Sequence, residues 1–278
     1  MLLEMAIGDS YGSAFEFADK RFVDKYNDVQ GYVIRKGRTP GNYTDDTQMA
    51  IAVAEAILAD DVFDQGALAQ RFVNCYKRDP REGYARGFRS LLDKVKDGKE
   101  FLSLIRPASD RSGSAMRSPP LGFLDSPRMV RKAALVQSRI THDTPEGINS
   151  SMASALMSHY FLYNKGSLAE LGSWLESEVP GNWNAPWDGK VGSKGVQCVR
   201  AAVTALVRNK TLSGVLHDCI AFGGDVDTVA AIAMAAASSS KEMERNIPIK
   251  FFENLENSDY GKDYLEDLDR NLIEIISP

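Results

Sequence analysis

The sequence predicts an all-α protein, a compact orthogonal multi-helix bundle in a single domain over residues 1–278. Apolar residues recur at helical spacing in about a dozen segments of the chain. No segment alternates apolar and polar residues over the length that a strand needs. With 44% hydrophobic and 26% charged residues, the composition is that of an ordinary globular protein. We therefore expect the fold to be built by packing helices on helices rather than on a sheet.

The N-terminal half is expected to begin with a central helix over residues 2–17, whose many small residues permit close packing with its neighbours. Residues 19–43 follow as a long loop punctuated by glycine and proline. Helical spacing resumes at about residues 47–58, then at 65–77, where Asp64 is the N-cap, and at 84–95.

The C-terminal half continues the same pattern. A serine- and glycine-rich turn from residue 109 leads into a short helix that Pro119 and Pro120 end. Asp143, Pro145 and Glu146 have the spacing of an N-cap and its capping box. The helices are expected at 127–137, 148–163, 168–179, 195–207, 212–222, 228–237, 248–255 and 264–276.

Two distant stretches place paired acids at the start of an apolar helix. They are Gly41-Asn-Tyr-Thr-Asp-Asp-Thr-Gln48 and Gly223-Gly-Asp-Val-Asp-Thr228. One interpretation is capping alone, by Thr44 or Asp45 in the first stretch and by Asp225 in the second. Capping needs only one acid per helix, however, and the two stretches hold four.

The same acids predict a metal site. The helix that follows Asp225 is apolar on every side, so its first turn should lie at the edge of the core. Buried paired carboxylates repel one another and lose hydration unless a cation joins them. Carboxylate and hydroxyl oxygens, without clustered Cys or His, suit Mg²⁺ or Mn²⁺. We expect the two stretches to meet in space and to share one or two divalent ions.

Four further positions have open interpretations. Glu16, between two phenylalanines, either faces solvent at a helix end or faces the metal site. The turn at Gly113 either starts a helix or offers backbone N–H groups to a phosphate or ribose. Arg117 suits an anion or a core carboxylate, and His142 suits a structural hydrogen bond or a ligand.

The bulk properties exclude several classes of protein. A net charge of −5 and a pI near 5.4 disfavour a general nucleic-acid surface. Three scattered cysteines are typical of reduced thiols in a cytoplasmic protein. The N-terminus lacks the basic region of a signal peptide, and no apolar run has the length of a membrane span. We expect a cytoplasmic monomer without a nucleic-acid or membrane partner.

Five short motifs, taken in order, resemble those of the ADP-ribosylglycohydrolases. They span nearly the whole chain and are Gly8-Asp9 with Glu16-Phe17, Tyr-Thr-Asp-Asp-Thr at 43–47, Gly-Ser-Ala-Met-Arg at 113–117, Thr141-His142, and the stretch at 223–228. The resemblance implies an all-α bundle with a dinuclear Mg²⁺ (or Mn²⁺) site. It also implies removal of ADP-ribose from modified proteins, often from arginine and in some members from serine or other acceptors.

Position by position, the resemblance assigns roles to individual residues. It implies metal ligands at Thr44, Asp45, Asp46, Asp225, Asp227 and Thr228. It implies that Glu16 lies near the metals and that Glu16 or Asp46 accepts a proton from the attacking water. It implies an ADP-ribose pocket lined by Gly113, Ser114, Met116 and His142.

Some features depart from the family pattern and leave alternatives open. Arg111 and Ser112 stand where the family turn commonly reads Gly-Asn, and Val226 stands where Ser or Thr is common. No Asp-Ile-Gly stretch of the kind that recognises a guanidinium in some relatives is present, so arginine specificity is not secured.

The alternative functions are an ADP-ribose-binding module without hydrolysis, a hydrolase of a small-molecule or serine-linked ADP-ribose, and a structural protein. Four clustered carboxylates disfavour the last. We expect the pocket entrance between residues 19–43 and the loop with Trp183 and Trp187.

Overall fold

The computed structural model describes residues 1–35 and 37–276, and within these residues it contains helices and no strand. The α-helices are α1 (Leu2–Ser13), α2 (Lys20–Tyr26), α3 (Asp45–Leu58), α4 (Gln65–Arg78), α5 (Arg86–Lys94), α6 (Gly98–Leu104), α7 (Gly113–Met116), α8 (Pro127–Arg139), α9 (Pro145–Leu162), α10 (Leu171–Glu178), α11 (Gly195–Arg208), α12 (Leu212–Ala221), α13 (Val226–Ala237), α14 (Ile249–Glu253) and α15 (Lys262–Ile276). The all-α prediction is confirmed.

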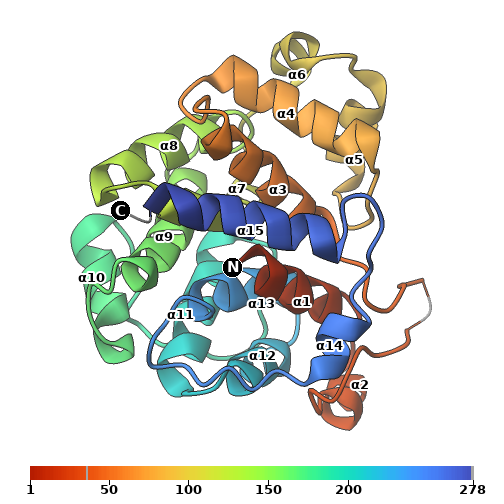
Figure 1. The fold of residues 1–278 in the computed structure, drawn as a ribbon, viewed down its shortest axis with the longest axis vertical. Coiled ribbons are helices and arrows are strands. Elements are labelled where there is room, and N and C mark those ends of the chain that lie inside the picture. The colour runs from red at the N-terminus through yellow and green to blue at the C-terminus, as the bar shows by residue number, and fades with distance from the viewer. Residues whose placement is uncertain (36, 277–278) are drawn as a thin grey trace.

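The centre of the molecule is the crossing of α1 and α13, which lie side by side in Figure 1. Every residue of α13 is buried, as its uniformly apolar sequence predicts. Two glycines of α1 make the close approach possible. A Cβ at Gly8 would lie 2.6 Å from the Ala230 carbonyl oxygen, and one at Gly12 would lie 2.5 Å from Cα of Asp227. The second contact places the C-terminal end of α1 directly against the first turn of α13.

The two ends of the described chain are joined across the surface of this crossing. The amino group of Met1 lies 3.0 Å from the Asp269 carboxylate in α15, which also accepts a hydrogen bond of 2.9 Å from the Leu2 N–H. In Figure 1, α15 runs across the front of the molecule next to α1. The first N–H groups of α1, those of Leu2 and Leu3, therefore donate to an acid that is distant in the sequence.

Helices α4, α5 and α6 form a group at one side of the molecule, at the top of Figure 1. A Cβ at Gly98 would lie 2.4 Å from the Gln70 nitrogen, so α6 packs tightly on α4. Asp64 caps α4 as predicted, accepting hydrogen bonds from the N–H groups of Gly66 and Ala67 at 2.7 and 3.0 Å.

Several local predictions need correction. The predicted loop over residues 19–43 contains α2, whose N-cap is Asp19, and α6 was not predicted. Both helices have seven residues and bury only one or two of them, so apolar spacing barely marks them. Thr144, and not Asp143, caps α9: its hydroxyl accepts a hydrogen bond of 3.1 Å from Gly147, whereas Asp143 pairs with Arg139.

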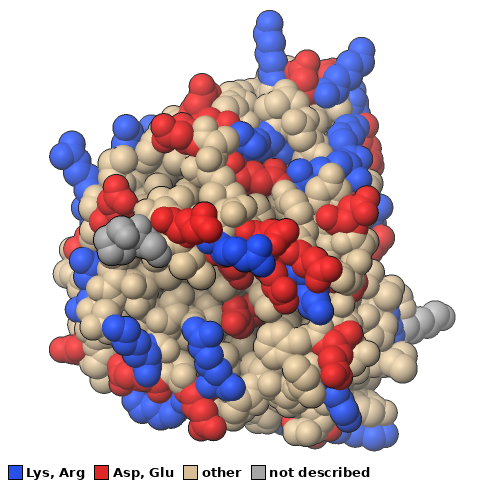
Figure 2. All heavy atoms as spheres, viewed as in Figure 1, with Lys and Arg blue, Asp and Glu red and all other residues tan. Residues whose placement is uncertain are grey.

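The three cysteines are buried free thiols, in agreement with the prediction. Among the described residues, no helix combines the length and the apolar character that crossing a bilayer requires. Figure 2 shows Lys and Arg side chains interspersed with Asp and Glu on the face that carries α15.

Candidate functional site

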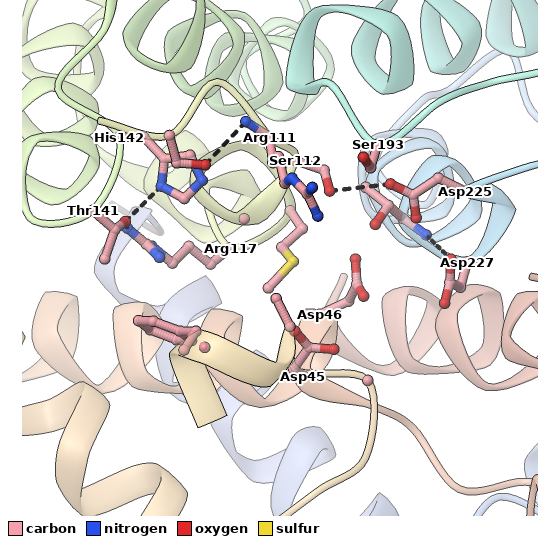
Figure 3. Close-up of a pocket in the computed structure, with 18 of the residues that line it drawn as sticks. Asp45, Asp46, Arg111, Ser112, Arg117, Thr141, His142, Ser193, Asp225 and Asp227 are labelled. Atoms are coloured by element: carbon pink, nitrogen blue, oxygen red, sulfur yellow. Dashed lines mark hydrogen bonds between the residues drawn. The ribbon is translucent and has the colours of Figure 1, made fainter. Parts of the chain in front are cut away.

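The two acidic stretches meet at one end of a cavity of about 670 Å³. Asp45 and Asp46 reach it from the first turn of α3, and Asp225, Asp227 and Thr228 reach it from the start of α13. Figure 3 shows the four aspartates converging from these two helices. The predicted meeting of the two stretches therefore agrees with the structure.

Asp9 of α1 holds the first stretch in place, a role that the sequence did not reveal. Its buried carboxylate accepts hydrogen bonds from the Thr44 N–H and hydroxyl at 2.9 and 2.7 Å, and from the Thr47 N–H and hydroxyl at 3.1 and 2.7 Å. Burial raises the pKa of Asp9, and the Thr47 and Thr44 hydrogen bonds oppose that rise. The available signal was an acid inside an otherwise small and apolar helix.

The capping interpretation of both stretches is wrong. Thr44 and Asp225 occupy the N-cap positions of α3 and α13, but neither side chain makes a capping hydrogen bond. At α3, Asp9 satisfies the orphan N–H groups from another helix. This arrangement leaves the side chains of Asp45 and Asp46 free to face the cavity.

A glycine turn fixes Asp225. Gly223 and Gly224 have φ values of 68° and 100°, and a Cβ at Gly224 would lie 1.8 Å from the Val191 carbonyl oxygen. That oxygen accepts a hydrogen bond of 3.1 Å from the Asp225 N–H. The Asp225 carboxylate then accepts a hydrogen bond of 3.2 Å from the Ser112 hydroxyl, and the Cys198 thiol lies 3.6 Å away.

The acid cluster carries more negative charge than a buried site tolerates without a cation. Burial, followed by repulsion among neighbouring carboxylates, raises the pKa values of Asp45, Asp46 and Asp227 well above the usual range. Oδ1 of Asp46 is buried and has no hydrogen-bond partner. An orphaned carboxylate oxygen among oxygen donors suits a hard divalent cation, so these residues fit the predicted metal.

Glu16 lies at the rim of the cavity, and one of its carboxylate oxygens lies within 4.8 Å of oxygens from Asp225 and Asp227. Its carboxylate therefore lies beside the acid cluster and does not point away into solvent. Burial raises its pKa, and Arg38, which pairs with the carboxylate, opposes that rise. The following residue, Phe17, has a strained φ of 47° and donates its N–H to the Gly224 carbonyl at 2.8 Å, which ties the Glu16 segment to the glycine turn.

Two predicted residues do not line the cavity. The Ser114 side chain is buried and donates a hydrogen bond of 2.9 Å to the Gly147 carbonyl, so it lies behind the lining of this cavity. Thr44 is also buried behind the wall, with its hydroxyl 2.7 Å from Asp9 and 3.4 Å from Asp46. As a metal ligand, Thr44 could offer only the lone pairs that remain on that hydroxyl.

Gly113, Met116 and His142 line the wall of the cavity beyond the acids. A Cβ at Gly113 would lie 2.9 Å from Cε1 of His142, so the turn and the ring are in contact. Burial, aided by the nearby Arg117, lowers the pKa of His142 to about 3. The ring is therefore neutral, with Nδ1 2.6 Å from the Thr141 hydroxyl.

Arg117 does not pair with a core carboxylate, which was one of its two predicted partners. It donates to the side chain of Gln137 at 2.5 Å and to the Thr141 hydroxyl at 2.7 Å, and it stacks on Phe72. Burial lowers its pKa to about 9. It forms part of the wall and donates a hydrogen bond to Thr141, which in turn contacts His142.

The opposite end of the cavity is apolar and lies at a place that the sequence did not indicate. Its lining comes from the α5–α6 side and includes Phe88, Leu91, Leu104 and Ile105. None of the described residues in 19–35 and 37–43, and neither Trp183 nor Trp187, lines the cavity, so the predicted entrance is wrong for the part of the chain that the structure describes. Trp183 is buried and donates to the Val179 carbonyl at 3.0 Å, which makes it a core residue.

The chain is similar to several known proteins. The family model described as ADP-ribosylglycohydrolase matches residues 1–277. ADP-ribosylhydrolase ARH3 from Homo sapiens is 32% identical over 178 residues, which cover 58% of this chain and 48% of ARH3. The chain thus matches about half the length of the ARH3 relatives.

ADP-ribosyl-[dinitrogen reductase] glycohydrolase from Rhodospirillum rubrum is 25% identical, and the match covers 86% of this chain and 83% of that protein. ADP-ribosylarginine hydrolase Tri1 from Pseudomonas putida (strain GB-1) is 24% identical over 84% of this chain and 67% of its own.

A solved structure shares the fold. It is described as an ADP-ribosylglycohydrolase-related protein complex, and it aligns with a TM-score of 0.75 over 99% of this chain and 96% of that one. Sequence identity across this alignment is 22%.

Proposed function

The chain belongs to the ADP-ribosylglycohydrolase family, and from this premise we propose that it is a metal-dependent hydrolase that releases ADP-ribose from a modified acceptor. The observation that carries the proposal is the convergence of two acid pairs, one with an unpartnered buried oxygen, in a cavity of about 670 Å³. A cavity of this volume is the usual size for a nucleotide-like ligand.

We assign the metal site to two Mg²⁺ ions, with Mn²⁺ as the possible substitute. Asp45, Asp46, Asp225, Asp227 and Thr228 would hold them, together with the remaining hydroxyl lone pairs of Thr44. When bound, the ions would supply Lewis acidity and orient the ribose hydroxyls. The ions would also neutralise the acid cluster. The negative charges that repel one another in the metal-free chain are therefore the charges that attract the cations.

The protein side chains would accept a proton and form the wall of the pocket. Glu16 or Asp46 accepts the proton of the attacking water, since both carboxylates face the cavity and both have raised pKa values. Water forms a bond to the anomeric carbon while the bond from that carbon to the acceptor breaks, and the acceptor leaves with the bonding electron pair. Positive charge develops on the ribose as this bond breaks, and the surrounding carboxylates favour that charge. His142 is neutral and serves as a wall of the pocket.

Arginine on a protein is the acceptor that we propose first, because one relative that matches 84% of this chain is named an ADP-ribosylarginine hydrolase. The name of a second relative, a glycohydrolase of ADP-ribosyl-dinitrogen reductase, supports a protein as the carrier of the modification. Serine-linked and small-molecule adducts are tested in parallel.

The test is release of free ADP-ribose from an arginine-ADP-ribosylated protein, with Mg²⁺ and with EDTA. Release that EDTA blocks supports the proposal. No release from the arginine-linked, serine-linked and small-molecule substrates would refute hydrolysis, and binding of ADP-ribose under those conditions would identify a binding module.

A further inference from the structure

Two arginines line the cavity and have no partner among the described residues. Arg106 and Arg111 belong to the segment between α6 and α7, and neither guanidinium group makes a hydrogen bond or an ion pair within the described chain. Arg117, the third arginine of the lining, differs because all of its contacts are internal. An arginine without an internal partner at the edge of a ligand-sized cavity is available to an anion.

The backbone that carries Arg111 is held firmly. Ser112 donates its N–H to the Ser193 carbonyl at 3.0 Å, and Gly195 donates to the Asp110 carbonyl at 3.1 Å. Lys194 closes the same contact with a salt bridge of 2.8 Å to Asp110. The backbone at Arg111 is therefore fixed, so a bound ligand would have to order only the side chain.

The position of Arg111 lies between the two chemically different ends of the cavity. Its neighbour Ser112 reaches Asp225 at the acidic end, and Figure 3 shows the Arg111 side chain beside Ser112. Arg106 follows Leu104 and Ile105, which belong to the apolar end. A ligand that spans the cavity therefore meets carboxylates first, then a guanidinium group, then apolar side chains.

ADP-ribose has its chemical groups in that same order: a ribose, a diphosphate and a nucleoside. We propose that Arg111 binds the diphosphate of ADP-ribose, with Arg106 as the second cation of the subsite; this inference rests on the proposed function. The planar guanidinium fork matches phosphate oxygens in pairs. It also offsets the repulsion that the acidic end exerts on a dianionic ligand in a protein of net charge −5.

The experiment is isothermal calorimetry at constant Mg²⁺ with ADP-ribose, ADP and adenosine. Arg111→Ala should weaken ADP-ribose and ADP about 10- to 100-fold, because it removes charge-assisted hydrogen bonds to phosphate. Its affinity for adenosine should change less than about 3-fold. Arg111→Lys, which keeps the charge but loses the fork, should fall between the two.

Arg128→Ala is the matched control, since Arg128 is exposed on α8 and lies outside the cavity lining. It should leave all three affinities unchanged. Melting temperatures within about 2 °C of the wild type would show that the variants fold equally well.

Unchanged ADP affinity in Arg111→Ala, or an equal loss for adenosine, would overturn the inference. If the wild type still releases ADP-ribose in that case, the proposed function stands without this residue role. Conversely, a wild type that binds ADP through Arg111 and releases no ADP-ribose would refute hydrolysis and retain the subsite.

Discussion

The acidic end of the cavity and its apolar end are built by different physical rules. At the acidic end, buried helices cross at glycines, and hydrogen bonds fix the aspartate-bearing turns. The Asp9 carboxylate and the Val191 carbonyl accept them, and the Ser112 hydroxyl donates one. At the apolar end, Phe88 and Leu91 are half-buried on a nine-residue helix. The first end requires particular atoms at particular places, whereas the second requires only apolar surface. Substitutions should therefore have large effects on activity or stability at the acidic end and small effects at the apolar end.

The largest expected effect is loss of turnover on removing one cluster carboxylate. Asp46→Asn or Asp227→Asn should reduce ADP-ribose release at least ~1,000-fold, because an amide neither holds a divalent cation as a carboxylate does nor accepts the proton of water. Asp188→Asn, on an exposed loop, is the control and should retain full activity. Full activity in both cluster variants would show that the reaction does not use this site.

The second largest effect is expected from Asp9→Asn. This substitution tests the hydrogen bonds that hold the site in place and not the chemical step. The amide retains one acceptor oxygen for four donors that now converge on the carboxylate, so we expect a loss of about 2–3 kcal/mol in the free energy of unfolding. Urea denaturation measures the loss. A change below about 0.5 kcal/mol would mean that the Asp9 contacts do not hold α3 in place.

This contrast also explains what the sequence could and could not predict. The apolar helices α3, α4, α9, α11 and α13 were predicted within a few residues because their spacing reports burial directly. The acid pairs were predicted as a metal site because buried like charges need a cation. The role of Asp9 was not predicted because its hydrogen-bond partners lie 35 and 38 residues away, a separation that local sequence patterns do not encode. The apolar end of the cavity was not predicted because half-buried side chains on short helices form no motif.

A pair of glycine substitutions compares the two ends directly. Gly12→Ala would bring a Cβ within 2.5 Å of Cα of Asp227 and should cost about 1–3 kcal/mol of stability, with weaker metal binding. Gly87→Ala on α5 meets open space and should stabilise the protein by about 0.5–1 kcal/mol. Thermal unfolding of both variants provides the comparison; equal effects would contradict the difference in packing.

The smallest expected effect is at the apolar wall. Leu91→Ala should raise KM for an ADP-ribosylated substrate about 3- to 10-fold and leave kcat unchanged, because the wall contributes binding that is equal in the ground and transition states. Steady-state kinetics would separate the two parameters. A fall in kcat with constant KM would place this end in the chemical step.

The most direct test of the metal site is a count of bound Mn²⁺ by electron paramagnetic resonance. At pH 7.5 the wild type should bind two ions per chain, and Asp46→Asn or Asp227→Asn should lose at least one. Affinity should fall as the pH is lowered, since carboxylates with raised pKa values take up protons before unperturbed ones do and then no longer bind the cation. A wild type that retains no Mn²⁺ at about 1 mM, or cluster variants that bind it as well as the wild type, would contradict the account.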